Sequence, residues 1–278
     1  MMERIFYQTS DGKKIFLDTY PYLMLTDTDV FNGAYKYDTI DDKELVRLYK
    51  GMESHSLKIK IFGKSEDDFY TNLKNLHDTL EKDSITESYG RLYYGQYYIN
   101  CVLTEKSYSS KFLKRQSTVV DYKIITSDES YWHKDILYTL EGGKKVEDPT
   151  GLNYDYNYEY NYTRGSSNEA IIENDYISSS DFVLTIHGYA YNPQVIIGDS
   201  IYRVNYTIQK EDYVIISSID KTVTLVKSNG VVVNLFPYRE KGYDIFQKIV
   251  AGENHIWWNG DYDIDILLIQ NRGEPGWI

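Results

Sequence analysis

Hydrophobic and polar residues alternate with period two along most of the chain, which is the pattern of β-strands with one buried face. In residues 57–61, leucine and isoleucine alternate with Lys58 and Lys60, which predicts a half-buried strand with a cationic outer face. Residues 93–103 carry two apolar runs around Gly95 and predict a hairpin. Residues 118–126 predict another strand of the same first domain.

One segment follows a helical period instead. Ser65 precedes three acidic residues, which is typical of a helix N-cap with a first turn that complements the helix dipole. Apolar residues then recur at spacings of three and four and form one stripe, namely Phe69, Leu73, Leu76 and Leu80. The spacing predicts a helix over residues 66–81, packed on the first domain. A shorter pattern at residues 243–250 favours a second, weaker helix.

Turn-forming residues concentrate between residues 141 and 151, and this change of character places a domain boundary at 148/149. Beyond it, short strands follow one another closely, and Gly198-Asp199 and Asn229-Gly230 suit two-residue hairpin turns that need positive φ. Short strands joined by tight turns indicate an all-β sandwich or barrel. The predicted strands are residues 182–190, 194–197, 201–208, 213–217, 222–226 and 231–236.

Composition narrows the function classes. The 278 residues carry a formal charge of −12, which argues against a protein that grips nucleic acid through its phosphates. A single cysteine, Cys101, excludes a disulfide scaffold and an all-cysteine metal site, and its apolar strand predicts that the thiol is buried. The N-terminus predicts no signal peptide, and no apolar run is long enough to span a membrane.

A search for chemistry finds no convergent acid, base or nucleophile, so we predict no enzyme, no catalytic residues, no cofactor and no metal site. The chain carries no zinc-protease, P-loop, nucleophile-elbow or dinucleotide-binding motif. The histidines are scattered with no pair at ligand spacing: His55, His77, His133, His187 and His255. A glycosidase would need one pair of catalytic carboxylates, and the acidic residues of this chain are too numerous for the sequence to single out two.

Three alternating aspartates, Asp261, Asp263 and Asp265, would share one face of a strand and could bridge a cation. A calcium loop that begins at Asp261 would need glycine at its sixth position and glutamate at its twelfth, where this chain has Ile266 and Arg272. The pattern therefore favours the solvated face of an amphipathic strand.

Tyrosine is unusually abundant, with 30 residues against 9 phenylalanines, and part of it is concentrated in one tract. In residues 153–162 every second residue is a tyrosine, so an extended tract would be about 33 Å long with all its tyrosines on one face. This pattern suits a strand that covers its own domain, a subunit interface or a sugar-stacking platform, and periodicity cannot separate the three. The candidate contact residues are Tyr154, Tyr156, Tyr158, Tyr160 and Tyr162.

An ordered set of signatures in residues 150–278 resembles the distal tail proteins of long, non-contractile-tailed phages and related prophages. It begins with Tyr154-Asp155-Tyr156-Asn157-Tyr158 and Asp181-Phe182-Val183-Leu184-Thr185-Ile186-His187-Gly188. It continues through Asn192-Pro193, Ile196-Ile197-Gly198-Asp199, Tyr213-Val214-Ile215-Ile216-Ser217-Ser218 and Ile245-Phe246-Gln247-Lys248-Ile249. The ending, Arg272-Gly273-Glu274-Pro275-Gly276-Trp277, has glycines at two positions where that family carries polar residues.

The resemblance implies a mostly β fold in two domains. Residues 1–148 would form a ring-forming β domain with the one helix, and residues 149–265 a galectin-like β-sandwich. In that family the last strand, here residues 266–278, can return to complete the N-terminal domain. The ring would be a hexamer without catalytic activity, located in the virion tail and assembled in the bacterial host cytoplasm. It would join the tail tube protein to the baseplate, the tail-tip hub protein and a receptor-binding protein.

Six chains at −12 each would carry about −72, so a ring of them would repel phosphates and let DNA pass without specific binding. The alternative function is a carbohydrate-binding β-sandwich module that recognises cell-wall or surface glycans. It would use the tyrosine tract or Trp257-Trp258, and adjacent residues of a strand face opposite sides, so at most one of these tryptophans can line a given surface.

Overall fold

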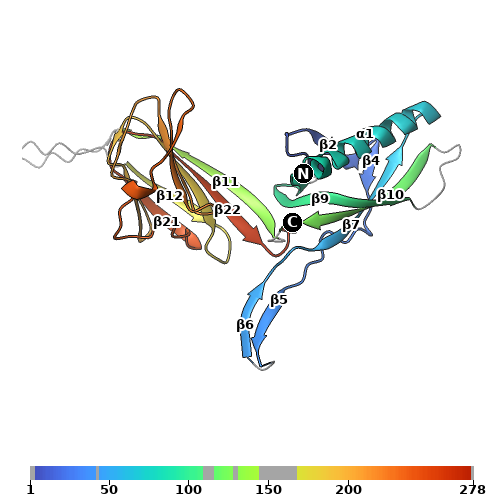
Figure 1. The fold of residues 1–278 in the computed structure, drawn as a ribbon, viewed down its shortest axis with the longest axis horizontal. Coiled ribbons are helices and arrows are strands. Elements are labelled where there is room, and N and C mark those ends of the chain that lie inside the picture. Colours follow the sequence, from blue (N-terminus) through green and yellow to red (C-terminus); the bar gives the residue numbers. More distant parts are fainter. Residues whose placement is uncertain (1–3, 42–43, 109–115, 128–130, 144–167, 277–278) are drawn as a thin grey trace, which may run out of the picture. The chain divides into compact units, whose positions relative to one another are not determined.

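The computed structural model describes residues 4–41, 44–108, 116–127, 131–143 and 168–276. The described chain is mostly β with one α-helix, which confirms the predicted fold class. It forms two compact units (Figure 1): unit 1 comprises residues 1–134 and 271–278, and unit 2 comprises residues 135–270. The chain crosses between them twice, in β11 (Trp132–Leu140) and in β22 (Ile264–Arg272).

Unit 1 is built on an antiparallel sheet in the order β9-β10-β7-β4-β3, with β8 paired to the other edge of β9, β1 to β8 and β2 to β1. The expected alternation holds in β7, where Leu57, Ile59 and Ile61 are buried and the two lysines between them are not. The strands are β1 (Ile5–Gln8), β2 (Lys14–Phe16), β3 (Asp18–Thr19), β4 (Tyr22–Met24), β7 (Ser54–Phe62), β8 (Gly90–Tyr94), β9 (Tyr97–Tyr108) and β10 (Ser117–Thr126).

Helix α1 (Glu66–Ile85) packs against β7 and β9 and covers the inner face of this sheet (Figure 1). The Ser65 side chain accepts a hydrogen bond from the Asp68 backbone N–H, so the predicted N-cap is confirmed. The predicted apolar stripe is buried against the sheet. The helix runs four residues beyond the predicted end because Asp83, in the extra turn, is held by Tyr7 and Ser10 from the N-terminal strands.

Unit 2 is a β-sandwich. One sheet has the order β20-β19-β18-β13-β22 and the other β12-β21-β15-β16, both antiparallel, and their inward side chains form one apolar core. The short strands β14 and β17 pair with each other and form a separate two-stranded sheet. The bounds are β12 (Asn168–Asn174), β13 (Asp181–His187), β14 (Ala190–Tyr191), β15 (Gln194–Ile197), β16 (Ser200–Arg203), β17 (Thr207–Ile208), β18 (Tyr213–Ser217), β19 (Thr222–Val226), β20 (Val232–Asn234), β21 (Gly252–Trp258) and a 3₁₀ turn, η1 (Phe236–Tyr238).

Local turn chemistry accounts for the hairpins. Gly95 and Gly198 have φ of 61° and 56° at the predicted β8–β9 and β15–β16 turns, a conformation that glycine adopts without a steric cost. The strands expected at 182–190 and 201–208 are each shorter and continue, after a break, as β14 and β17.

The weaker helix predicted at residues 243–250 is wrong. These residues form turns, with Ile245, Phe246 and Ile249 buried in the core of unit 2. The Asp244 side chain accepts a hydrogen bond from the Phe246 backbone N–H at 3.0 Å, and such a local bond offers the backbone an alternative to a helix.

The units divide at residues 134/135 and 270/271. The domain boundary predicted at 148/149 falls in residues 144–167, outside the described residues, so the division into domains 1–148 and 149–265 stays a prediction.

Candidate interaction surfaces

Exposed large apolar side chains of unit 1 concentrate on a two-stranded hairpin, β5 (Lys36–Ile40) and β6 (Glu44–Tyr49), which we call the arm (Figure 1). Its strands pair with each other and with no other strand in the described part of the chain. An isolated two-stranded hairpin is marginally stable in water unless something packs on it. The arm therefore presents a surface suited to a partner.

The register gives the arm two different faces. Tyr37 lies opposite Leu48, and Thr39 lies opposite Leu45, so these four side chains share one face. Tyr37 is 66% exposed, and each of the two leucines is 56% exposed. This side of the arm is apolar and solvent-exposed.

The opposite face of the arm is polar. Asp38 lies opposite Arg47, Ile40 opposite Glu44, and the Arg47 guanidinium stacks 5.0 Å from the centre of the Tyr49 ring. This face therefore carries the charged side chains of the hairpin together with the exposed Ile40, whereas the other face exposes Tyr37, Leu45 and Leu48 to solvent.

The root of the arm is fixed by polar contacts within unit 1. The Lys50 side chain is buried, and its ammonium donates to the Gly273 carbonyl at 2.9 Å. Burial lowers the pKa of Lys50 below its usual value, and Glu53 and Glu274 act in the opposite direction. The Ala34 backbone N–H donates to the Glu53 carboxylate at 3.0 Å. The arm thus projects from an ordered base.

The arm was not among the strands predicted from the sequence. Its signal is present, because Tyr35, Tyr37 and Thr39 alternate with polar residues and Asp41 follows as a turn former with a φ of 49°. The pattern is short and interrupted by a register shift between Asp38 and Thr39, which puts the apolar residues of the second strand out of strict alternation.

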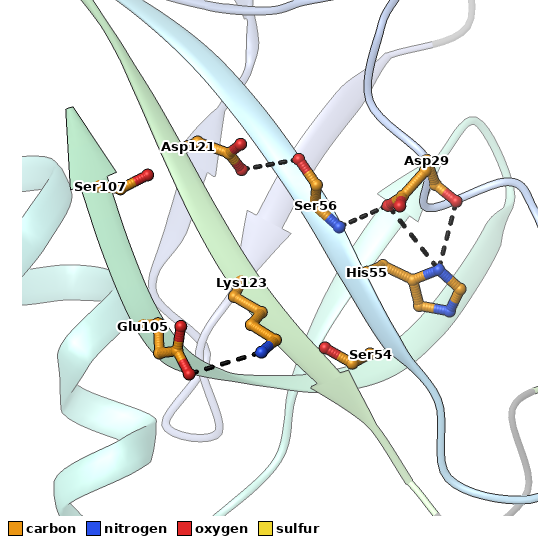
Figure 2. Close-up of a pocket in the computed structure, with 8 residues that line it drawn as sticks. All are labelled: Asp29, Ser54, His55, Ser56, Glu105, Ser107, Asp121 and Lys123. Atoms are coloured by element: carbon orange, nitrogen blue, oxygen red, sulfur yellow. Dashed lines mark hydrogen bonds and ion pairs between the residues drawn. The ribbon is translucent and has the colours of Figure 1, made fainter. Parts of the chain in front are cut away.

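A polar groove of about 320 Å³ crosses the face of the unit 1 sheet opposite α1 (Figure 2). Figure 2 shows its side chains directed toward one another: Ser56 Oγ donates to Asp121 at 2.6 Å, and Lys123 Nζ lies 3.4 Å from Glu105. Asp29 accepts from the Ser56 backbone N–H, and its own carbonyl lies 3.2 Å from His55 Nδ1. These pairings engage Asp29, Ser56, Asp121, Lys123 and Glu105 with one another, and no histidine donates to or accepts from a serine hydroxyl among the described residues of the groove.

His77 and Cys101 have structural roles. His77 lies between the hydroxyls of Tyr108 and Tyr122, at 2.8 and 2.6 Å, and burial lowers the pKa of His77. Cys101 is fully buried, which confirms the prediction, and burial raises the pKa of its thiol to about 12.

The three aspartates alternate with buried residues, as in the amphipathic pattern favoured above, but only Asp265 lies in a strand, β22, and Asp261 and Asp263 precede it. Tyr262, Ile264 and Ile266 are buried, whereas Asp263 accepts from the Gly142 backbone N–H at 2.8 Å and Asp265 pairs with His187 Nε2 at 2.8 Å. Across the described ranges, no group of three or more potential ligand residues is placed to hold a metal ion.

The tyrosine tract lies outside the described residues. Tyr154, Tyr156, Tyr158, Tyr160 and Tyr162 therefore stay predicted contact residues. Trp257 and Trp258, in contrast, are described and face opposite sides of β21, as predicted, with only Trp257 exposed.

The fold is similar to chains in solved phage structures. A chain of the phage P2 baseplate in its activated conformation with calcium aligns at 14% identity and a TM-score of 0.57, over 99% of this chain and 100% of that one. A chain of the same baseplate with strontium aligns at 13% identity and a TM-score of 0.57, over 98% of this chain and 99% of that one. The SPP1 Dit (gp 19.1) protein aligns at 9% identity and a TM-score of 0.57, over 96% of this chain and 98% of that one. That protein is described as a paradigm of the hub adsorption apparatus in phages that infect Gram-positive bacteria.

No family model and no curated protein sequence matches the chain. At these identities the structural comparisons establish a shared fold along nearly the full length, and the mostly β fold class with a β-sandwich, implied by the sequence resemblance, is confirmed. Among the described residues, no helix is both long enough and apolar enough to cross a membrane.

Proposed function

We propose that the chain is a structural component of a phage tail that assembles into a ring at the baseplate. The observation that carries this proposal is the fold shared, over 96–99% of this chain, with phage baseplate and hub proteins. The ring is a hexamer that adapts the tail tube protein to the tail-tip hub and receptor-binding proteins. The protein acts in the virion tail, after assembly in the host cytoplasm, and catalyses no reaction.

The arm supports self-association. Its apolar face exposes Tyr37, Leu45 and Leu48 from a root held by hydrogen bonds, and apolar burial is the main driving force of association between subunits. In a ring, each arm would lie on the neighbouring copy with this face inward. The charged face, which carries Asp38 and Arg47, would stay toward solvent.

The net charge suits a ring around DNA. Each chain contributes −12, and a hexamer carries about −72, so the electrostatic field of the ring disfavours phosphate contact and lets DNA slide. In this arrangement carboxylates of the ring face the channel.

The test is the oligomeric state of the purified chain, measured by size-exclusion chromatography with light scattering and by negative-stain imaging. We expect a mass of several times 32.6 kDa and rings with six-fold symmetry. The Tyr37→Ser/Leu48→Ser double variant should shift the protein toward the monomer.

The matched control is Asp38→Ser/Arg47→Ser, which changes the same two strands on the opposite face and should leave the assembly intact. A wild-type chain that stays monomeric at high concentration, even with tail proteins added, would contradict the proposal. If both double variants changed the oligomeric state equally, the apolar face of the arm would not be the surface that drives assembly.

A further inference from the structure

The outer face of the second unit 2 sheet carries a groove of about 690 Å³ around Trp257. Its walls come from β12, β15 and β21, three neighbouring strands of the order β12-β21-β15-β16. Trp257 is 39% exposed, which is unusual for the largest apolar side chain when a core lies directly beneath the same strand. The groove therefore contains an aromatic surface that is not used for packing.

The strand register aligns four side chains in one row across this sheet. Glu169 lies opposite Trp257, Trp257 opposite Ile196, and Ile196 opposite Ile201. Directly opposed side chains on one face have Cβ atoms about 5 Å apart. The row therefore places the Glu169 carboxylate, the Trp257 indole and two isoleucine side chains next to one another, within a length of about 15 Å.

A second row lies one step further along the strands. Ile171, which is 57% exposed, lies opposite His255, and the backbone N–H of Gly198 donates to the His255 carbonyl at 2.8 Å. His255 therefore lies on the same face as Trp257, two residues away on β21. The imidazole and the Glu169 carboxylate both flank the indole.

Both flanking polar groups are available. In the described part of the chain, the side chains of Glu169 and His255 are exposed and make no hydrogen bond or ion pair. A carboxylate accepts hydrogen bonds and a neutral imidazole can both donate and accept, so the pair can bind hydroxyl groups that lie above the indole. Pockets for small ligands combine this kind of apolar surface with a few convergent polar groups.

We propose that this groove binds a saccharide, with one sugar ring stacked on Trp257 and its hydroxyls bound by Glu169 and His255. A pyranose presents a face of C–H groups to an aromatic ring and a rim of hydroxyls to polar side chains, and the groove offers both at the spacing of adjacent strands. A protein partner would need an apolar area far larger than one indole and three isoleucines.

The charge of this face selects the class of sugar. Besides Glu169, the outward residues of β12 and β21 include Glu173 and Glu253, which lie opposite each other. The basic residue on the same face, Arg203, lies on β16, two strands away from Trp257, whereas Glu169 lies directly opposite the indole. The negative field around Trp257 disfavours sugars that carry carboxylate, phosphate or sulfate groups. The ligand is a neutral or amino-bearing oligosaccharide.

The experiment is a fluorescence titration of the full-length chain with three probes, supported by calorimetry. The probes are chitotriose, its deacetylated cationic form and 3′-sialyllactose, which is anionic. We expect a change in tryptophan emission and measurable binding with at least one of the first two, and binding at least about tenfold weaker with the sialylated probe.

Variants locate the site. Trp257→Ala should weaken binding by about tenfold or more, and Trp257→Phe should retain part of it because a smaller ring still stacks. Glu169→Gln should weaken binding, whereas Glu173→Gln, four residues along the same strand and outside the groove, should not. Circular dichroism and the melting temperature of each variant show that the sandwich is intact.

Three results would overturn the inference. They are the absence of binding of all three probes at millimolar concentration, binding that Trp257→Ala retains in full, and a preference for the anionic probe. Each of these can occur while the ring assembly of the proposed function holds, because that assembly is measured by mass and symmetry and not by sugar binding.

Discussion

Trp257 and Trp258 are consecutive residues of β21, yet Trp258 is 3% exposed in the core of unit 2 and Trp257 is 39% exposed on the other side of the same sheet. The indole N–H of Trp258 donates to the Tyr262 carbonyl at 2.9 Å. One side chain therefore supports the sandwich and its neighbour supplies a surface, because successive residues of a strand point to opposite faces.

This pair predicts a large effect on stability for one tryptophan and a small effect for the other. Trp258→Ala should lower the free energy of unfolding of unit 2 by about 3–5 kcal/mol, because it leaves a large cavity and an unpaired carbonyl. Trp257→Ala should change it by less than about 1 kcal/mol. Urea denaturation followed by circular dichroism measures both, and similar losses for the two variants would show that the outer face also packs.

Asp83 predicts a second stability effect, in unit 1. Its buried carboxylate accepts hydrogen bonds from the Tyr7 hydroxyl at 2.6 Å and from the Ser10 hydroxyl and N–H at 2.7 and 3.0 Å. Asp83→Ala should lower the free energy of unfolding by about 3 kcal/mol, because the buried Tyr7 hydroxyl and the two part-buried donors of Ser10 lose a charged acceptor. Asp78→Ala, at an exposed position of α1, is the matched control and should cost under about 1 kcal/mol in the same denaturation experiment.

The approach of β7 to α1 makes Gly63 sensitive to any side chain. A Cβ at this position would overlap the backbone nitrogen and Cα of Phe69, in the first turn of the helix. Gly63→Ala should therefore lower the free energy of unfolding by about 2 kcal/mol. Gly242→Ala, where a Cβ meets no atom within 4 Å, should leave the melting temperature nearly unchanged, and equal melting temperatures for the two variants would contradict the packing argument.

Buried tyrosines predict loss of stability at alkaline pH. Burial raises the pKa of Tyr22 from its usual value of 10.0 to about 12. Burial raises the pKa values of Tyr122 and Tyr202 by more than that of Tyr22. A group whose pKa is higher in the folded state stabilises the protein fully below its unfolded pKa. This contribution is lost as the pH rises from 10 toward the folded value.

Each such tyrosine should therefore lower the free energy of unfolding by about 1.4 kcal/mol per pH unit above pH 10. Urea denaturation at several alkaline pH values, with tyrosinate absorbance as the second signal, measures the slope. Tyr202→Phe should reduce it by one group, whereas Tyr243→Phe, at an exposed position, should not. A slope unchanged in Tyr202→Phe would contradict the buried-phenol explanation.

Local elements could be predicted because their signals lie within a few residues. The N-cap of α1 depends on Ser65 and Asp68, and the β15–β16 turn depends on the positive φ of Gly198. The segment around Ile245 shows the limit of this approach, since a helical spacing of apolar residues was satisfied by turns buried in the sandwich. Burial of apolar residues is compatible with more than one backbone path.

The arm and the groove show what a local pattern could not predict. Tyr37 and Leu48 share a face only because of their register, and that register includes a shift that breaks simple alternation. Glu169 and Trp257 lie 88 positions apart in the sequence and become neighbours only when β12 pairs with β21.

The sequence by itself determined the mostly β class, the one helix and its cap, the tight turns, and the absence of a familiar catalytic motif, because each depends on residues close together in the chain. Only the tertiary structure decided that residues 271–278 belong to unit 1, that the arm exposes an apolar face, and that Trp257 rather than Trp258 lines a groove. Those outcomes depend on which strands pair and in which register, and pairing between distant segments is settled by the packing of the whole core.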